Sequence, residues 1–270
     1  MTPPEPTSQR VVVAQVSDIH LGSDEQHVAD GLLRDLHEQD PTMTVVSGDL
    51  TMRARSHQFE AARAYLDQLP QPLIVVPGNH DIPLYDVVTR ISGPFDKYRK
   101  HIHGELDPVL QVPGATVLGL NSMPRWRWKS GHLSERQGEL VEQVLGGAPA
   151  GDVRILVTHH PVLPKDLSGM VNRSDIVASA ASAKVDLLLA GHTHDPLVAP
   201  VILRGRVHDR EALSVVAGTA ISDRRRGANN SYPVITVTPQ QMTVDVRQWM
   251  GRGFVTALTA TFDRRLEERP

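Results

Sequence analysis

The sequence predicts an α/β protein whose last third adds a mostly antiparallel sheet. Up to about residue 197, short β-branched runs alternate with stretches of helical apolar spacing, a pattern typical of strands linked by helical crossovers. Beyond Leu197 the helical stretches stop and strand-like runs joined by turns remain. Motifs rich in Asp, His and Gly follow the strand-like runs directly, so we expect the chemistry at the ends of the strands.

Composition limits the classes of function. The chain has 270 residues and a formal net charge of -3, which does not favour a nucleic-acid polymer or a membrane surface as partner. It contains no cysteine, so any metal must be bound by oxygen and imidazole. The sequence shows neither a signal-peptide pattern nor an apolar run of membrane-spanning length. We therefore expect a cytoplasmic protein without stable membrane association.

The first half of the chain predicts three strands and two helices ahead of a less regular segment. Val11–Val16 is a compact β-branched run and predicts a buried strand. Apolar residues recur at helical spacing from about Glu25 to Gln39. Residues 82–115 have the least regular pattern and predict a lid or surface excursion. The other expected elements are strands at Thr42–Val46, Leu73–Val76 and Val117–Leu120, and a helix at Ser56–Leu69 with Ser56 as N-cap.

The second half continues the alternation and then becomes all-β. Residues 11–262 contain no internal repeat and no Gly/Ser-rich linker, so we expect them to form a single domain. A flexible N-terminus over residues 1–10 and a polar C-terminal tail over residues 263–270 would flank it. The expected helices are Ser134–Leu145 and Ser174–Ala183, and the expected strands are Val153–Val157, Val185–Leu189, Val198–Leu203, Leu213–Ala217, Pro233–Val237 and Met242–Val246.

Five short motifs stand at the carboxyl ends of predicted strands. Loops far apart in the sequence converge at that edge of an open α/β sheet. In extended backbone, residues i and i+2 point to the same side, so Asp18 and His20 could reach one ion, as could His192 and His194. The motifs are Asp18-Ile19-His20, Gly48-Asp49, Gly78-Asn79-His80-Asp81, His159-His160 and Gly191-His192-Thr193-His194.

Each motif alone has an ordinary structural explanation, but the ordered set favours a metal centre. Asp49 alone could be a turn or N-cap aspartate, and Pro77-Gly78-Asn79 alone could be a turn. Gly48 lets the backbone turn and bring the Asp49 carboxylate inward. Unlike an imidazole, that carboxylate can bridge two cations with its two oxygens. Two carboxylates and a bridging hydroxide would leave two divalent ions with about one unneutralised positive charge, which suits an anionic phosphate ester.

In this order the motifs resemble those of calcineurin-like metallophosphoesterases, over roughly residues 11–195. Ser17-Asp18-Ile19-His20-Leu21, Gly48-Asp49-Leu50-Thr51 and His159-His160-Pro161 are similar to bacterial class III cyclic nucleotide phosphodiesterases. The stretch from Leu118 through Gly131-His132-Leu133 is similar to the same subgroup, whose members more often carry Asp where Asn121 stands.

The resemblance implies a four-layer α-β-β-α sandwich of two mixed sheets flanked by helices. It also implies two divalent or trivalent metal ions, typically Mn, Fe or Zn, and a homodimer. In the implied ligand sets, one ion takes Asp18, His20, Asp49 and His194, and the other takes Asp49, Asn79, His159 and His192.

Two neighbours of these ligands carry expected roles. We expect His80 to be the catalytic residue, either stabilising the equatorial phosphate oxygens or protonating the leaving alkoxide. We expect Asp81 to orient a histidine, with a helix cap as the alternative. His160 is either an outer contact of the metal centre or a satisfied structural histidine.

Outside the motifs, two clusters and one exposed group have open interpretations. Arg224-Arg225-Arg226 either contacts a phosphate or nucleotide, or is a solvated charge run. Trp126-Arg127-Trp128-Lys129 could stack on a substrate base, touch a lipid interface or simply pack as a loop. We expect Arg204, Arg206 and His208 to lie on the surface.

The expected function is hydrolysis of a small phosphodiester, in particular a 3′,5′-cyclic nucleotide such as cAMP, with some promiscuity. One alternative is a hydrolase of nucleotide-lipid pyrophosphates of the UDP-diacylglucosamine type, which would need an apolar acyl groove; another is a general phosphodiesterase. A protein phosphatase fits less well, because no large regulatory extension is present. A non-catalytic binding scaffold would have lost ligands, whereas every expected ligand position is filled here.

Overall fold

The computed structural model describes residues 10–84, 86–124, 126, 130–164, 170–171, 173–225 and 227–264. Several expectations fall outside these ranges: residues 1–9 of the N-terminus, residues 265–270 of the tail, and Arg127, Trp128, Lys129 and Arg226.

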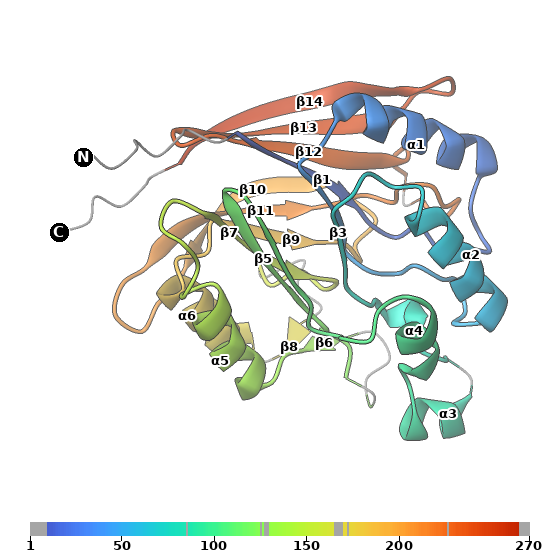
Figure 1. The fold of residues 1–270 in the computed structure, drawn as a ribbon, viewed down its shortest axis with the longest axis horizontal. Coiled ribbons are helices and arrows are strands. Elements are labelled where there is room, and N and C mark those ends of the chain that lie inside the picture. Colours follow the sequence, from blue (N-terminus) through green and yellow to red (C-terminus); the bar gives the residue numbers. More distant parts are fainter. Residues whose placement is uncertain are drawn as a thin grey trace.

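Two six-stranded mixed sheets lie face to face, and helices cover their outer sides (Figure 1). This confirms the predicted four-layer α-β-β-α architecture. The first sheet has the order β14-β13-β12-β1-β2-β3. Its parallel strands are β1 (Val11–Val16), β2 (Met43–Val46) and β3 (Leu73–Val75), and its antiparallel strands are β12 (Ser231–Val237), β13 (Gln241–Trp249) and β14 (Phe254–Asp263).

The second sheet has the order β10-β11-β9-β7-β5-β4, and its two edge strands run antiparallel to the rest. A separate pair joins β6 (Gly131–His132) to β8 (Met170–Val171). The parallel strands of the second sheet are β5 (Ala115–Leu120), β7 (Val153–Thr158), β9 (Leu187–Ala190) and β11 (Arg210–Val216), and the edge strands are β4 (Val109–Val112) and β10 (Leu197–Leu203).

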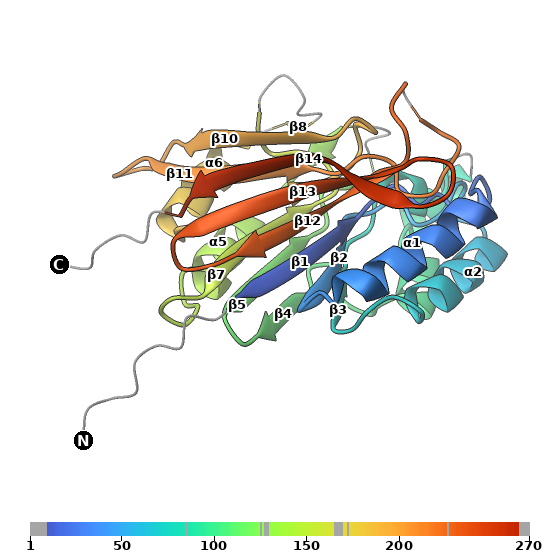
Figure 2. The same ribbon diagram turned by 90° about the horizontal axis from the view of Figure 1, so that it is seen from above.

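The central strands of each sheet are buried on both faces, which explains why they read as continuous apolar runs. In β1, Val11 and Val13 enter the core between the sheets, whereas Val12 and Val16 enter the core under the helices. The first sheet carries α1 (Gln26–Gln39) and α2 (Ser56–Leu66), and Figure 2 shows α1 on its outer face. The second sheet packs against α5 (Glu135–Val144) and α6 (Arg173–Ser182).

A buried ion pair fastens α1 to the first sheet. The Asp35 carboxylate accepts hydrogen bonds from the Tyr232 hydroxyl of β12 and from the Arg247 guanidinium of β13. Gly31 lies one turn before Asp35, and a Cβ there would overlap the ring of Trp249. The helix therefore approaches the sheet closely, and the Asp35 carboxylate that it buries is both paired with a charge and hydrogen-bonded.

The segment 82–115 is more regular than expected. It contains two six-residue helices, α3 (Val87–Ser92) and α4 (Asp96–His101), followed by β4. Helices of this length show little apolar periodicity, so the sequence pattern missed them. Tyr98 of α4 is fully buried and donates a hydrogen bond to the Val75 carbonyl. This segment is thus anchored to the first sheet rather than forming a loose excursion.

Three further differences have local causes. Helix α2 begins at Ser56 with Arg55 as N-cap, because the Gln58 side chain accepts hydrogen bonds from the backbone N–H groups of Arg53 and Arg55. Strand β9 begins at Leu187 rather than Val185, whose N–H still bonds to Ala180 at the end of α6. Strand β14 was not expected, because this edge strand is largely exposed and lacks a clean alternation.

Among the described helices, the longest has 14 residues, and none is long and apolar enough to cross a membrane.

Candidate metal centre

All seven predicted metal-ligating residues lie in loops that leave the carboxyl ends of parallel strands. The first sheet contributes the loops after β1, β2 and β3, and the second sheet contributes those after β7 and β9. The structure brings together residues 174 positions apart in the sequence, since the His192 N–H donates to Asp18 Oδ2 at 3.0 Å. The site therefore lies where the ends of both sheets meet.

Four of these residues form one group with ligand atoms within 4.8 Å of one another. All four side chains are buried. His20 Nε2 lies 3.7 Å from an oxygen of each of the two carboxylates, and His194 Nε2 lies 3.4 Å from Asp18 Oδ1. The members of this first group are Asp18, His20, Asp49 and His194.

The two oxygens of Asp18 have different surroundings. Oδ2 accepts hydrogen bonds from the Ser17 hydroxyl at 2.6 Å and from the His192 N–H. Oδ1 is buried without a hydrogen-bond partner, and so are both ring nitrogens of His20. Buried polar atoms without partners are costly. A metal ion coordinated by Oδ1 and one imidazole nitrogen would satisfy two of these three atoms, so the residues present fit the metal that the motifs predict.

The remaining predicted ligands form a second group around Asn79. The side-chain oxygen of Asn79 lies 3.1 Å from His159 Nε2 and 3.0 Å from His192 Nδ1. His159 Nδ1 lies 2.9 Å from the Ser47 carbonyl, which can only accept, so Nδ1 carries a proton. The Nε2 lone pair of neutral His159 would then face oxygen lone pairs. A cation between them, either a proton or a metal ion, removes that repulsion.

Asp49 connects the two groups. Its Oδ2 faces His20 at 3.7 Å, and its Oδ1 faces His159 at 3.4 Å. The His80 N–H donates to Oδ1 at 2.8 Å and fixes the orientation of the carboxylate. Each oxygen is thus directed at a different group, which is the arrangement expected of a bridging carboxylate.

The backbone at these motifs differs from our expectation. Asp18, His20, Asp49, His192 and His194 all have positive φ angles, between 46° and 72°. The proposed alternation of an extended chain is therefore wrong: left-handed bends, not strand geometry, turn these side chains toward each other. Such residues are uncommon, although Asp and His adopt this region more readily than most. Strain of this kind concentrates at functional sites.

Three of the motifs begin with a glycine, and each of these glycines leaves space for a residue of another motif. A Cβ at Gly78 would overlap the Asp49 carboxylate, and one at Gly191 would overlap Ser17 and lie 2.6 Å from Asp18 Oδ2. Gly48 has a φ of +96°, and a Cβ there would lie 2.6 Å from His159 Nδ1. These glycines therefore set how closely the loops approach.

Burial and charge move the pKa values of the site in opposite directions. Burial lowers the pKa of His20 to about 4, against the attraction of Asp49 and Asp18, and burial with the charge of His159 lowers that of His192 to about 4. Burial also opposes charge on His159, but Asp49, Asp18 and the Ser47 carbonyl together raise the pKa of His159 to about 9. Burial would raise the pKa of Asp49, but His159, with His20 and His80, holds the pKa of that carboxyl well below its usual range.

Asp81 does not orient a histidine, so that expectation is wrong. Its carboxylate accepts hydrogen bonds from the backbone N–H groups of Leu50, Thr51 and Gly78 at 2.9–3.1 Å, and from the Thr51 hydroxyl. It therefore joins the loop after β2 to the loop after β3. Burial and the nearby Asp49 charge raise the pKa of Asp81 to about 6.

His80 lies beside the first group, with its ring edge-to-face against His20 at a centroid distance of 4.8 Å. Its Nδ1 lies 2.9 Å from the Met52 carbonyl, so Nδ1 carries the proton. Its Nε2 lies 3.0 Å from Arg224 Nη1, and since a guanidinium only donates, Nε2 accepts. The role of Arg224 was open from the sequence alone, and its contact with His80 assigns it to the site.

The other candidate residues have defined surroundings. His160 is fully buried, with its Nδ1 2.8 Å from the Ser122 hydroxyl and its ring 4.4 Å from that of His192. It thus packs behind the second group. Arg225 forms an ion pair with Glu25 at 2.7 Å. Arg204, Arg206 and His208 are exposed, as expected.

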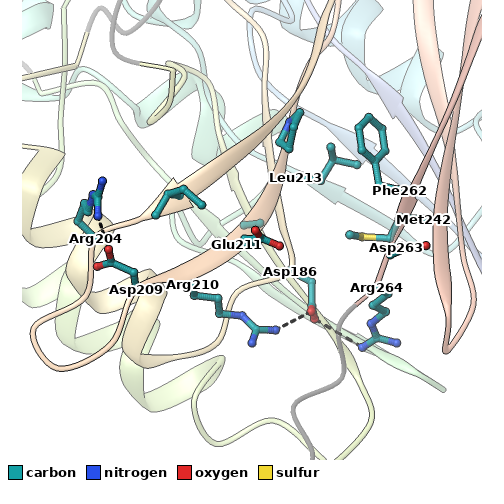
Figure 3. A pocket seen from close by; sticks show the side chains of 13 residues that line it. Asp186, Arg204, Asp209, Arg210, Glu211, Leu213, Met242, Phe262, Asp263 and Arg264 are labelled. Carbon is teal, nitrogen blue, oxygen red and sulfur yellow. Dashed lines mark hydrogen bonds and ion pairs between the residues drawn. The ribbon is translucent and has the colours of Figure 1, made fainter.

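Two cavities differ in their relation to the site. A cavity of about 310 Å³ adjoins it and is lined by Met52, Arg53, Asn79, His80, Ile82, Leu84 and Arg224. A larger one of about 660 Å³ lies at the opposite ends of the strands, where Asp186 precedes β9 and Arg210 begins β11. Figure 3 shows Asp186 there between Arg210 and Arg264. The larger cavity is therefore separate from the predicted metal ligands.

Comparison with known proteins agrees with this geometry. The family model described as calcineurin-like phosphoesterase matches residues 11–196. A probable cyclic nucleotide phosphodiesterase from Synechococcus sp. is 28% identical over 201 residues, covering 69% of this chain and 74% of that protein. The 3′,5′-cyclic adenosine monophosphate phosphodiesterase of Escherichia coli is 28% identical over 218 residues, covering 73% of this chain and 74% of that enzyme.

A solved structure shows the same fold at lower sequence identity. The purple acid phosphatase from yellow lupin seeds superposes with a TM-score of 0.69 at 13% identity, over 97% of this chain. This chain spans 55% of the length of the lupin protein, so the likeness concerns the fold.

We expect Gly78→Ala to lose metal, because its Cβ would displace the Asp49 carboxylate that faces both groups. Changes that disturb the orientation of metal ligands typically reduce metal affinity by about 10- to 100-fold. Metal content after desalting, measured by mass spectrometry, checks this against Gly104→Ala, where a Cβ meets nothing within 4 Å. Parental metal content in Gly78→Ala, with a native circular dichroism spectrum, would contradict the prediction.

We also expect metal binding to release about one proton near neutral pH. The pKa of His159, raised to about 9, means that the metal-free protein holds this proton below that pH. His20 and His192, with pKa values lowered to about 4, are already neutral there. Metal affinity should therefore increase as pH rises toward 9. Calorimetry in buffers of different ionisation enthalpy measures the release, and binding without release between about pH 6 and 8 would refute the assignment.

Proposed function

Because this chain belongs to the calcineurin-like phosphoesterase family and is a metal-dependent phosphoester hydrolase, we propose that it cleaves 3′,5′-cyclic nucleotides, above all cAMP. The observation that carries the proposal is the pair of ligand groups that share Asp49 beside a cavity. The names of the Synechococcus and Escherichia coli relatives support the substrate class.

In this proposal, each group of ligands binds one ion. The first ion would be held by Asp18, His20, Asp49 and His194, and the second by Asp49, Asn79, His159 and His192. Two such ions, when bound, lower the pKa of a shared water and polarise the phosphoryl group that it attacks. The identity of the ions as Mn, Fe or Zn, a homodimer and a cytoplasmic location stay predictions of the family resemblance.

The chain's own residues fix the orientation of the ligands. The Ser47 carbonyl accepts from His159 Nδ1 and leaves Nε2 for the ion. The Arg224 carbonyl, 2.8 Å from His194 Nδ1, does the same for His194 Nε2. The Thr219 hydroxyl lies 2.7 Å from the same Nδ1. Such contacts select one tautomer and one ring orientation.

We propose that His80 acts on the substrate. Its backbone N–H is bonded to Asp49 Oδ1 and its Nδ1 to Met52, so the ring is held with Nε2 toward the cavity wall that includes Asn79 and Arg224. From there Nε2 can give up its bond with Arg224, take up the proton that the attacking water loses, and donate that proton to the phosphate or the leaving oxygen. The apolar side of the cavity, formed by Ile82 and Leu84, would receive the esterified part of the substrate.

A kinetic panel with the Mn-loaded protein tests the substrate. We expect the highest kcat/KM for 3′,5′-cAMP among 3′,5′-cAMP, 2′,3′-cAMP, a nucleotide-lipid, bis(p-nitrophenyl) phosphate and a phosphomonoester. The cavity of about 310 Å³ is at the small end of ligand sites, which disfavours a diacylated substrate. Negligible cAMP turnover beside strong hydrolysis of bis(p-nitrophenyl) phosphate would refute the cyclic nucleotide and leave a general phosphodiesterase.

We expect His80→Ala to retain both metals while kcat falls by about 10²- to 10⁴-fold, as for the loss of an acid–base group. The predicted ligands do not include His80, whose Nε2 bonds to Arg224 instead. Metal analysis and turnover are measured on the same preparation, with His103→Ala, an exposed histidine, as the matched control. Metal loss in His80→Ala would mean that His80 is itself a ligand.

A further inference from the structure

We propose that Arg224 is the residue that binds the substrate phosphate, with its guanidinium directed at a non-bridging oxygen. This inference rests on the proposed phosphodiesterase function. It concerns a residue that the expected metal ligands do not include, and it follows from how the loop after β11 is held against the site.

The main chain of Arg224 is fixed at the edge of the metal centre. Its carbonyl accepts from His194 Nδ1, and its N–H donates to the Ser222 hydroxyl at 3.1 Å. Ser222 is buried, and its carbonyl accepts from the Asn230 side chain at 2.8 Å. The backbone therefore places this side chain next to a predicted ligand whatever the side chain is.

The guanidinium of Arg224 is held in place, but only some of its N–H groups donate hydrogen bonds. Nη1 donates to His80 Nε2 at 3.0 Å and lies 3.5 Å from Met52 Sδ. Among the described residues, Nε and Nη2 of Arg224 make no hydrogen bond. The side chain is half-buried and lines the cavity with Asn79 and His80. Donors in this fork geometry match two oxygens of a phosphate.

The charge of Arg224 also lacks a counterion in the described chain. The neighbouring Arg225 pairs with Glu25 at 2.7 Å, and the Asp223 carboxylate accepts from the Ser23 hydroxyl at 2.5 Å. No carboxylate of the described residues forms an ion pair with Arg224. A half-buried cation without a carboxylate, facing a cavity beside predicted metal ligands, favours an anionic ligand.

The contact with His80 indicates how the residue works. Nη1 of Arg224 donates to the lone pair of His80 Nε2. A phosphate oxygen is a stronger acceptor for a guanidinium than a neutral imidazole is. Arriving phosphate would therefore take over the guanidinium and leave the Nε2 lone pair free to take up the proton of the attacking water and pass it to the leaving oxygen. Arg224 thus binds the substrate and makes His80 available in the same movement.

The test measures binding of inorganic phosphate to the Mn-loaded protein by calorimetry. Arg224→Met should weaken phosphate affinity by about 10- to 100-fold, the size expected for charge-assisted hydrogen bonds. Arg224→Lys should lose less phosphate affinity, because lysine keeps the positive charge but lacks the forked donors of the guanidinium. Arg225→Met is the matched control and should stay within about twofold of the parent, because its partner is Glu25. Metal content should be equal in all four proteins, since the Arg224 carbonyl that holds His194 is retained.

Three results would overturn the proposal: phosphate binding by Arg224→Met as tight as by Arg225→Met, metal loss from Arg224→Met, or no saturable phosphate binding by the parent. The phosphate measurement needs no turnover of a nucleotide. If the parent hydrolyses no cyclic nucleotide, the proposed substrate fails while this measurement still decides the role of Arg224.

Discussion

The carboxylates of Asp18 and Asp49 lie at most 1% exposed where the two sheets meet, and their charge must be compensated. An uncompensated charge at such depth costs several kcal/mol. Backbone N–H groups reach one oxygen of each, from His192 to Asp18 and from His80 to Asp49. Asp18 Oδ1 still has no hydrogen bond. A bound cation would supply the missing compensation, so the stability of this protein should be coupled to its metal content.

The left-handed bends of the site depend on contacts between loops. Each such residue costs of order 1–3 kcal/mol if unsupported, and five occur among the predicted ligands. The bends after β1 are held by the loop after β2, since the Asp18 N–H bonds to the Gly48 carbonyl at 3.1 Å and the His20 N–H to the Asp49 carbonyl at 3.0 Å. Behind them, the buried Gln15 side chain bonds to Ser47 and to the Ala190 carbonyl of the other sheet. The strain is thus distributed over both sheets.

The α/β alternation and the convergence of seven residues could be predicted from apolar runs and strand ends, whereas the four layers followed only from the family resemblance. The sequence did not predict the backbone geometry, since left-handed bends at Asp and His leave no periodic signal. The predicted role of Asp81 was wrong. Its carboxylate, two positions after Asn79, reaches the backbone N–H groups of Leu50 and Gly78 more easily than it reaches a histidine ring. Arg224 lies 144 positions from His80, and only the tertiary fold reveals such a contact. The glycines were visible in the sequence, but the residues they make room for were not.

One short segment after β11 joins metal binding to phosphate recognition. It is tied to the loop after β1, through the Glu25 N–H to the Ile221 carbonyl at 2.9 Å and the bridge between Asp24 and Ser222. The backbone of Arg224 orients His194, and its side chain reaches His80. Any shift of this backbone would therefore move a ligand and the phosphate-binding group together. A change confined to the side chain would alter phosphate binding alone, so substrate preference can vary at this position while the metal centre keeps its geometry.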